Sequence, residues 1–460
     1  LKPRVPAEDF GPMVARISFF VNAGIRFVTE MCKMRAFVEL WDEICQERYG
    51  VENPKHRRFR YGVQVNSLGL TEQQPENNVY RILIEMLAVT LSKKARARAV
   101  QLPAWNEALG LPRPWDQQWS MRMQQIMAYE TDLLEYDDLF DNNPAVDRKV
   151  AALKDGARHE LANLDSMGGA IDAIDYMKGR LVESNSARLN RIEAGETVVV
   201  GVNKWQQGEA SPLMTGDGGI MVVDPAVEAE QIDRLNDWRA GRDADKVEDA
   251  LAALRDAAKS GANIMPASIQ AAKAGVTTGE WAAQMRAVHG EYRGPTGVSL
   301  NPSNMTEGLD DLREAVDLVS DRLGRRLKFV IGKPGLDGHS NGAEQIACRA
   351  RDVGMDISYD GIRLTPAEIV EKAREDDAHV VGLSILSGSH IPLVEDLMER
   401  MRQEGLGETP VIVGGIIPDE DADRLRAMGV ARVYTPKDFE LNTIMNDIVV
   451  LADPKAVAAE

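Results

Sequence analysis

The sequence predicts an α/β protein whose residues 326–460 form a doubly wound, flavodoxin-like (Rossmann-like) domain. From Arg326 onward, short apolar runs alternate with helix-like segments, which is the pattern of parallel βα units. These runs are almost continuously apolar, as strands are in a sheet that helices cover on both faces. Residues 1–125 show the same alternation, but too few units to close an eight-stranded barrel.

The predicted elements fall into four regions. In residues 1–125 the apolar spacing predicts helices over 27–49 and 78–91 and strands over 59–65 and 97–102. Residues 126–205 are predicted to be helical and to pack on the first region, with helices over 146–167 and 171–194. Residues 206–325, rich in Ala, Asp, Glu and Gly, form a helical connector and linker with a helix start at Thr277 and loops over 211–219 and 290–304.

In residues 326–460 we expect five strands, each followed by a helix. The predicted strands are 327–331, 356–359, 379–385, 410–414 and 431–434, and the predicted helices start near 341, 366, 391, 419 and 439. Parallel strands joined in this way take right-handed crossovers.

Composition excludes several classes of function. The chain has 460 residues with 54 basic and 72 acidic side chains, and its net charge of −18 disfavours nonspecific binding to nucleic acid. No stretch approaches the roughly 20 apolar residues that span a membrane. Cys32, Cys45 and Cys348 lie far apart and predict ordinary thiols in a reducing compartment, so we expect a cytoplasmic protein.

A candidate metal site follows the first strand of the C-terminal region. The segment from Lys333 to Gly342 contains Asp337 and His339 in the pattern Asp-x-His-x-x-Gly. Ligands bind open α/β sheets outside the carboxyl ends of the strands. A carboxylate two residues before the histidine can hold one ring nitrogen and orient the other toward a metal. Gly342 would let the backbone approach a bulky planar ligand.

An isolated motif of this kind is more often a surface loop that caps the next helix. Two later strand ends favour the metal site: one carries Ser384 and Leu386, and the other carries Gly414 and Gly415. Together they would form a floor of small residues beside His339. His390, just past the first of these strands, is interpreted as structural or exposed to solvent.

This set of motifs resembles the cobalamin-binding domain of adenosylcobalamin-dependent mutases and corrinoid methyltransferases. The resemblance implies that His339 is the axial ligand to cobalt and that Asp337 is its partner. It further implies that the cobalamin tail lies in a slot lined by Ser384, Leu386, Gly414, Gly415 and Tyr434.

The earlier part of the chain resembles the methylmalonyl-CoA mutase family. The resemblance rests on Gly11 to Phe20, Glu30 to Ala36, Gln64 to Asn78, Asn106 to Pro112, Met167 to Gly169 and Val200 to Lys204, which follow in the family's order. It implies that residues 1–125 are the later part of a (β/α)8 TIM-type substrate barrel. The family's histidine, tyrosine and arginine that grip the substrate have no counterparts in this chain, so its catalytic residues are unknown.

Five barrel residues take roles from the resemblance. Gln64 and Glu107 match groups near the corrin and the adenosyl ribose, whereas Arg16, Ser18 and Lys55 match groups that contact coenzyme A. Simpler interpretations of two of these residues stay open. In these, Glu107 is a carboxylate at the start of a helix, and Arg16 takes part in a surface ion pair.

Three departures from methylmalonyl-CoA mutase resemble the ethylmalonyl-CoA mutase branch of the family. They are the absence of a tryptophan in 64–73, the basic segment from Lys93, and Ser-Asn after His339. We therefore expect an isomerase that converts ethylmalonyl-CoA to methylsuccinyl-CoA by 1,2-migration of the thioester carbonyl group. The alternatives are methylmalonyl-CoA mutase activity, a corrinoid-binding module without catalysis, and a flavodoxin-like domain without cobalt.

The resemblance also implies an acyl-CoA substrate and a homodimer. Because the chain begins at a leucine and lacks the early barrel strands, we expect a fragment, an incompletely determined chain, or one subunit of a split enzyme whose partner supplies those strands.

Overall fold

A computed structural model describes residues 5–95, 97–209, 211, 219–221, 224–298, 309–438 and 440–454. Compact packing divides the chain into one unit of Leu1–Met221 with Pro295–Glu460 and a second unit of Val222–Gly294. Parts of the predicted loops over 211–219 and 290–304 lie outside the described residues. None of the described helices is long and apolar enough to cross a membrane.

The N-terminal region is built on a three-stranded parallel sheet in the order β1-β2-β3. Its elements are α1 (Ala7–Val14), β1 (Phe19–Ala23), α2 (Phe27–Glu47), β2 (Tyr61–Val65), α3 (Asn77–Thr90), β3 (Ala99–Gln101) and α4 (Pro114–Tyr129). Both predicted helices and both predicted strands of this region are confirmed. The sequence analysis missed β1, a run of only five residues.

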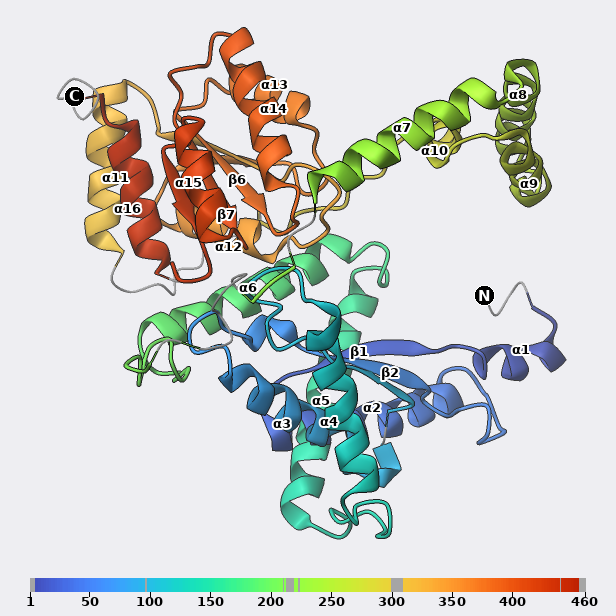
Figure 1. The fold of residues 1–460 in the computed structure, drawn as a ribbon. Coiled ribbons are helices and arrows are strands. Elements are labelled where there is room, and N and C mark those ends of the chain that lie inside the picture. The colour runs from blue at the N-terminus through green and yellow to red at the C-terminus, as the bar shows by residue number, and fades with distance from the viewer. Residues whose placement is uncertain are drawn as a thin grey trace. The chain divides into compact units, whose positions relative to one another are not determined.

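Helices α2 and α3 cover one face of this sheet (Figure 1). Met34 of α2 and Val89 of α3 pack in one apolar core with Ala23, Tyr61 and Val63 from the strands. On the opposite face Phe20, Asn22, Gln64 and Gln101 are exposed. Helices on the same side of successive parallel strands are the arrangement of a barrel wall, in which the bare face is the interior.

Two long helices follow, α5 (Pro144–Ser166) and α6 (Ile174–Glu193), close to the predicted 146–167 and 171–194. Val146 and Val150 of α5 pack on Met31, Cys32 and Ala36 of α2. The second unit consists of α7 (Pro225–Gly241), α8 (Ala244–Ser260), α9 (Ile264–Ala274) and α10 (Thr278–His289). Helix α10 starts where the sequence predicts, because Thr277 and Glu280 form a capping box.

The C-terminal sheet has five parallel strands in the order β5-β4-β6-β7-β8. After α11 (Asp310–Leu323), its strands and helices alternate as β4 (Lys328–Gly332), α12 (Asn341–Asp352), β5 (Asp356–Tyr359), α13 (Pro366–Glu375), β6 (Val380–Ile385), α14 (His390–Gln403), β7 (Val411–Gly415), α15 (Asp419–Ala427), β8 (Arg432–Tyr434) and α16 (Leu441–Ala452). The predicted five strands, five helices and flavodoxin-like order are confirmed.

Helices cover both faces of this sheet (Figure 1). Residues of α11, α12 and α16 form one apolar core against it, and residues of α13, α14 and α15 form a second core on the other side. Leu327, Phe329, Val380 and Val381 are completely buried between these layers. The sheet is therefore closely packed on both faces, and the carboxyl ends of its strands meet at one edge.

Candidate cobalamin site

His339 lies in the loop between β4 and α12, and a buried ion pair holds this loop. The Lys333 ammonium lies 2.6 Å from Oδ2 of Asp337, and the two side chains are 0% and 4% exposed. Lys333 also donates to the carbonyl oxygen of Ser384 at 3.2 Å, and the Leu386 N–H donates to Oδ2 of Asp337. The loop after β4 is thus tied to the end of β6.

Asp337 in turn orients His339. Its Oδ1 accepts from the backbone N–H of His339 at 3.0 Å and lies 2.6 Å from the ring Nδ1. Burial alone would raise the pKa of Asp337, but the hydrogen bonds and charge of Lys333 and His339 outweigh burial and hold this pKa well below its usual range. An ionised carboxylate only accepts hydrogen bonds, so Nδ1 carries the proton.

The imidazole that results presents Nε2 to solvent. The His339 side chain is 78% exposed, although the carboxylate that holds it is buried. A neutral imidazole with one nitrogen bonded to a carboxylate and the other free is how histidine binds metals in proteins. The arrangement fits a cobalt that is held mainly by its own macrocycle and needs one protein ligand.

The strand register aligns the small residues that were predicted to line a slot. Ser384 pairs with Gly414, and Gly414 pairs with Tyr434, so the three lie in one row across β6, β7 and β8. A Cβ on Gly414 would meet atoms only at 3.9 Å or more, and one on Gly342 would lie 3.6 Å from Oγ of Ser384. The protein itself leaves room at these two glycines, which fits a ligand that passes close to the backbone.

Position 415 is a glycine for a different reason. A Cβ at this position would lie 1.8 Å from the carbonyl oxygen of Ile385, its partner on β6. This glycine is therefore required by strand pairing, whatever binds beside it. Tyr434 is also engaged within the protein, because its hydroxyl donates to Asp447 at 2.9 Å; its ring packs against the apolar core.

The predicted barrel residues separate into two groups. Gln64, the fourth residue of β2, lies on the exposed face in register with Asn22 and Gln101. Arg16, Ser18 and Lys55 are exposed and precede the first residues of β1 and β2, at the opposite ends of these strands.

Glu107 lies in a turn between β3 and α4, so the alternative of a helix-start carboxylate is wrong. Buried side chains fix this turn: Asp116 accepts from Trp105 at 3.0 Å and from Asn106 at 2.8 Å, while Asn78 donates to the Trp105 carbonyl. Glu107 itself is half-buried.

The structure gives His390 and Lys333 partners within the protein. His390 is buried, and its Nε2 lies 2.8 Å from Asp421, so of the two interpretations the structural one is confirmed and exposure to solvent is wrong. Lys333 received no role in the sequence analysis, although it anchors Asp337. The sequence pattern that could have indicated this role is the position of Lys333 four residues before Asp337. The three cysteines are free and buried.

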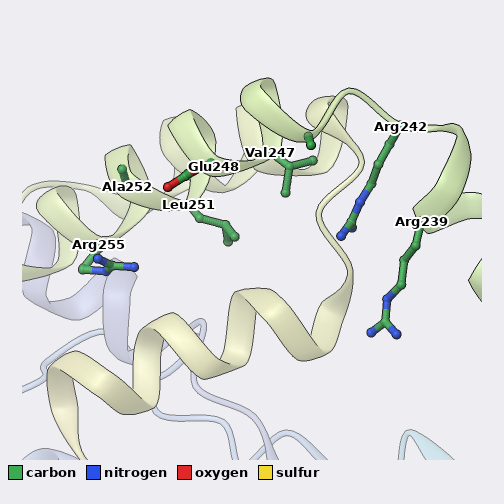
Figure 2. Close-up of a pocket in the computed structure, with 8 residues that line it drawn as sticks. Arg239, Arg242, Val247, Glu248, Leu251, Ala252 and Arg255 are labelled. Atoms are coloured by element: carbon green, nitrogen blue, oxygen red, sulfur yellow. The ribbon is translucent and has the colours of Figure 1, made fainter.

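A cavity lies elsewhere, in the second unit. It measures about 350 Å³, and its lining includes Arg239, Arg242, Val247, Leu251 and Arg255 (Figure 2). The Arg242 guanidinium is already paired with Glu280. None of the predicted site residues lines this cavity, and we assign it no part in cobalamin binding.

Comparison with known proteins decides the family. The family description Methylmalonyl-CoA mutase matches residues 7–291, and the B12 binding domain matches residues 327–438. The chain belongs to the methylmalonyl-CoA mutase family. The predicted fold class and enzyme class, an isomerase of the cobalamin-dependent acyl-CoA mutases, are therefore confirmed, and the cofactor is a cobalamin.

Within this mutase family, similarity differs strongly between branches. The chain is 75% identical over 460 residues to ethylmalonyl-CoA mutase of Cereibacter sphaeroides, covering 100% of this chain and 70% of the relative. Identity to ethylmalonyl-CoA mutase of Methylorubrum extorquens is 64% over 446 residues, covering 96% and 64%. Identity to methylmalonyl-CoA mutase of Cereibacter sphaeroides is 32% over 435 residues, covering 93% and 60%.

Proposed function

We propose that this chain acts in the rearrangement of ethylmalonyl-CoA to methylsuccinyl-CoA, with adenosylcobalamin as the form of its cofactor. The observation that carries the proposal is the exposed His339 imidazole, whose Nδ1 lies beside the carboxylate of Asp337. That carboxylate is buried and paired with Lys333 just after β4. The choice of substrate is supported by 75% identity to an ethylmalonyl-CoA mutase against 32% to a methylmalonyl-CoA mutase.

When bound, adenosylcobalamin supplies the radical chemistry, and the protein supplies binding, orientation and exclusion of side reactions. His339 Nε2 would hold the cobalt, while Asp337 keeps the proton on Nδ1. Ser384, Leu386, Gly414, Gly415 and Tyr434 would line the tail slot, and Gly342 would admit the corrin edge. These assignments place the cofactor at the carboxyl edge of the C-terminal sheet.

The substrate would lie along the bare face of the N-terminal sheet. Arg16, Ser18 and Lys55 would contact coenzyme A at the amino ends of the strands, where a cation or hydroxyl can bond phosphate or amide groups. Gln64 and Glu107, toward the carboxyl ends, would face the cofactor's corrin and ribose. A closed barrel wall around this face would keep water and oxygen from a radical.

We further propose the four-region organisation predicted from the sequence: 1–125 as barrel wall, 126–205 as helices packed on it, 206–325 as connector, and 326–460 as cobalamin domain. The last helix of the connector, α11, packs in the core of the cobalamin domain. We also propose a cytoplasmic enzyme that works as a homodimer or with a further chain that supplies the other barrel strands.

An absorption spectrum of the full chain with adenosylcobalamin, followed by a coupled assay with both acyl-CoA substrates, tests the proposal. His339→Ala is expected to weaken cobalamin binding at least tenfold and to abolish the spectrum of histidine-ligated cobalt. His289→Ala, an exposed histidine in the second unit, serves as the matched control. Preference for methylmalonyl-CoA would refute the substrate, and histidine-type spectra from His339→Ala would refute the site.

A further inference from the structure

Helix α6 packs against α12, the helix that begins two residues after His339. Val182 of α6 belongs to the same apolar core as Ala343 and Ala347 of α12. The two helices are also joined by polar contacts along their length. Ser186 donates to Gln345 at 2.9 Å, and Arg349 donates to Asn190 at 2.6 Å and to Glu193 at 2.8 Å. Displacing α6 would therefore displace α12.

The contact nearest His339 is made by Lys178. Its ammonium lies 2.6 Å from Oε1 of Glu344 and 3.3 Å from Oγ of Ser340, the residue that follows His339. The Glu344 side chain is only 4% exposed and that of Lys178 is 27% exposed. The backbone of Gly297 lies against the Lys178 side chain. A Cβ added at Gly297 would lie 2.9 Å from Cγ of Lys178.

The His339 loop is thus fixed at both ends by a lysine. Lys333 holds Asp337 at its start from within the C-terminal sheet, and Lys178 holds Ser340 and Glu344 at its end from α6. The first lysine sets the orientation of the imidazole ring. The second acts on the position of the backbone from which that ring extends.

We propose that Lys178 is a positioning residue for the cobalt ligand: its contacts with Glu344 and Ser340 set where the His339 loop stands and so how well Nε2 reaches cobalt. The inference rests on the proposed function and adds to it a residue outside the cobalamin-binding motif. Because α6 follows α5, which packs on α2 of the barrel wall, the same contact links the cobalt ligand to the substrate region.

Lys178→Met in the full chain is the principal test. Methionine keeps the apolar stem but removes the ammonium, leaving Glu344 buried without its cation. We expect adenosylcobalamin to bind about tenfold more weakly, with a smaller histidine-ligated fraction in the spectrum. Arg180→Met, which removes an exposed cation from the same helix, is the matched control.

A measurement on the cofactor-free chain distinguishes a positioning role of Lys178 from a general contribution to stability. In the apo chain, Lys178→Met should speed amide hydrogen exchange in the first turn of α12, at Glu344 and its neighbours, while the last turn near Arg349 keeps its protection. Uniformly faster exchange across α12 would overturn the proposal, because it would indicate a purely structural role.

Two further variants keep the test decisive if Lys178→Met folds poorly. Lys178→Arg, which can still pair with Glu344, should restore affinity to within about threefold, as should the exchange of charges in Lys178→Glu with Glu344→Lys. If Lys178→Met binds like Arg180→Met, the positioning role is refuted while the proposed function stands. Failure of the wild type to bind cobalamin through His339 would instead refute the proposed function.

Discussion

The two parallel sheets of this chain use their strands differently. The five-stranded C-terminal sheet is covered on both faces, and its candidate site lies at the carboxyl edge, in loops and strand ends. The three-stranded N-terminal sheet is covered by α2 and α3 on one face, and its candidate residues include Gln64 on the exposed face. Because helices bury both faces of the C-terminal sheet, a ligand can bind only at its edge. Because one face of the N-terminal sheet is bare, side chains within its strands can contact a ligand directly.

This difference implies different costs of substitution. At the edge of the C-terminal sheet, site residues share backbone contacts and buried charges with the fold, so changes there should affect stability as well as binding. On the bare face of the N-terminal sheet, a side chain has few partners of its own, so changes should affect activity alone. Three of the four predictions below test this contrast, and the one on Glu85 concerns a buried carboxyl of α3.

Gly415→Ala should have the largest effect. Its Cβ would lie 1.8 Å from a carbonyl oxygen of β6, so β6 and β7 must separate. We expect loss of more than about 3 kcal/mol or failure to fold. Gly414→Ala, where space is open, should remain folded and lose cobalamin affinity. Urea unfolding and cofactor titration compare the two, and equal stability of both variants would contradict the argument.

Lys333→Met should come next. It leaves the Asp337 carboxylate buried without its cation, which costs about 3–5 kcal/mol, and it also releases the Ser384 carbonyl. Thermal unfolding of the apo chain should show the loss. Lys246→Met removes an exposed lysine whose partner, Asp243, is 48% exposed, and this control should cost less than about 1 kcal/mol.

Glu85 of α3 should make stability depend on pH. Burial, reinforced by Glu30 and opposed by Arg81, raises the pKa of this carboxyl from 4.5 to about 8. The folded chain then holds a proton that the unfolded chain releases, so its contribution to stability is complete below pH 4.5 and is lost as pH rises to 8, by about 1.4 kcal/mol per pH unit.

Glu85→Gln should remove this slope and unfold at a higher temperature than the wild type at pH 9. Thermal unfolding at pH 5, 7 and 9 provides the measurement. Parallel pH profiles of the two proteins would show that Glu85 does not hold the proton.

Gln64→Leu should have the smallest effect on stability. The side chain is exposed on the bare face, and such substitutions usually change the free energy of unfolding by less than about 0.5 kcal/mol. Turnover of ethylmalonyl-CoA should nevertheless fall about tenfold or more. A stability loss as large as that of Lys333→Met would remove the distinction between the two sheets.

The sequence predicted the C-terminal half well because its signals are local. Apolar runs such as Phe329 to Ile331 mark strands in a covered sheet, and Asp337 and His339 are only two residues apart. The N-terminal half was harder to predict. The five residues of β1 alternate between covered and exposed positions, and its exposed face pairs Asn22 with Gln64, so part of the strand carries polar residues.

Contacts between distant segments were beyond prediction from one sequence. Lys178 and Glu344 are separated by more than a hundred residues, and no spacing rule relates them. The same holds for Asn106, whose side chain donates to the carbonyl oxygen of Gly219, more than a hundred residues later. By contrast, the role of Lys333 was within reach, since a lysine four residues before a buried aspartate is a local pattern.

The place of α11 has a practical consequence for dissecting the molecule. Leu309, Val316 and Val319 fill the same apolar core as Ile444 and Ile448 of α16, although they precede the first strand of the sheet. A shortened recombinant chain that starts at Arg326 would expose that core to water and should aggregate or be degraded by proteases. One that starts before Leu309 keeps these residues, and one that also includes Val298 and α6 with Val182 keeps the whole of this core for crystallising the cobalamin-binding half.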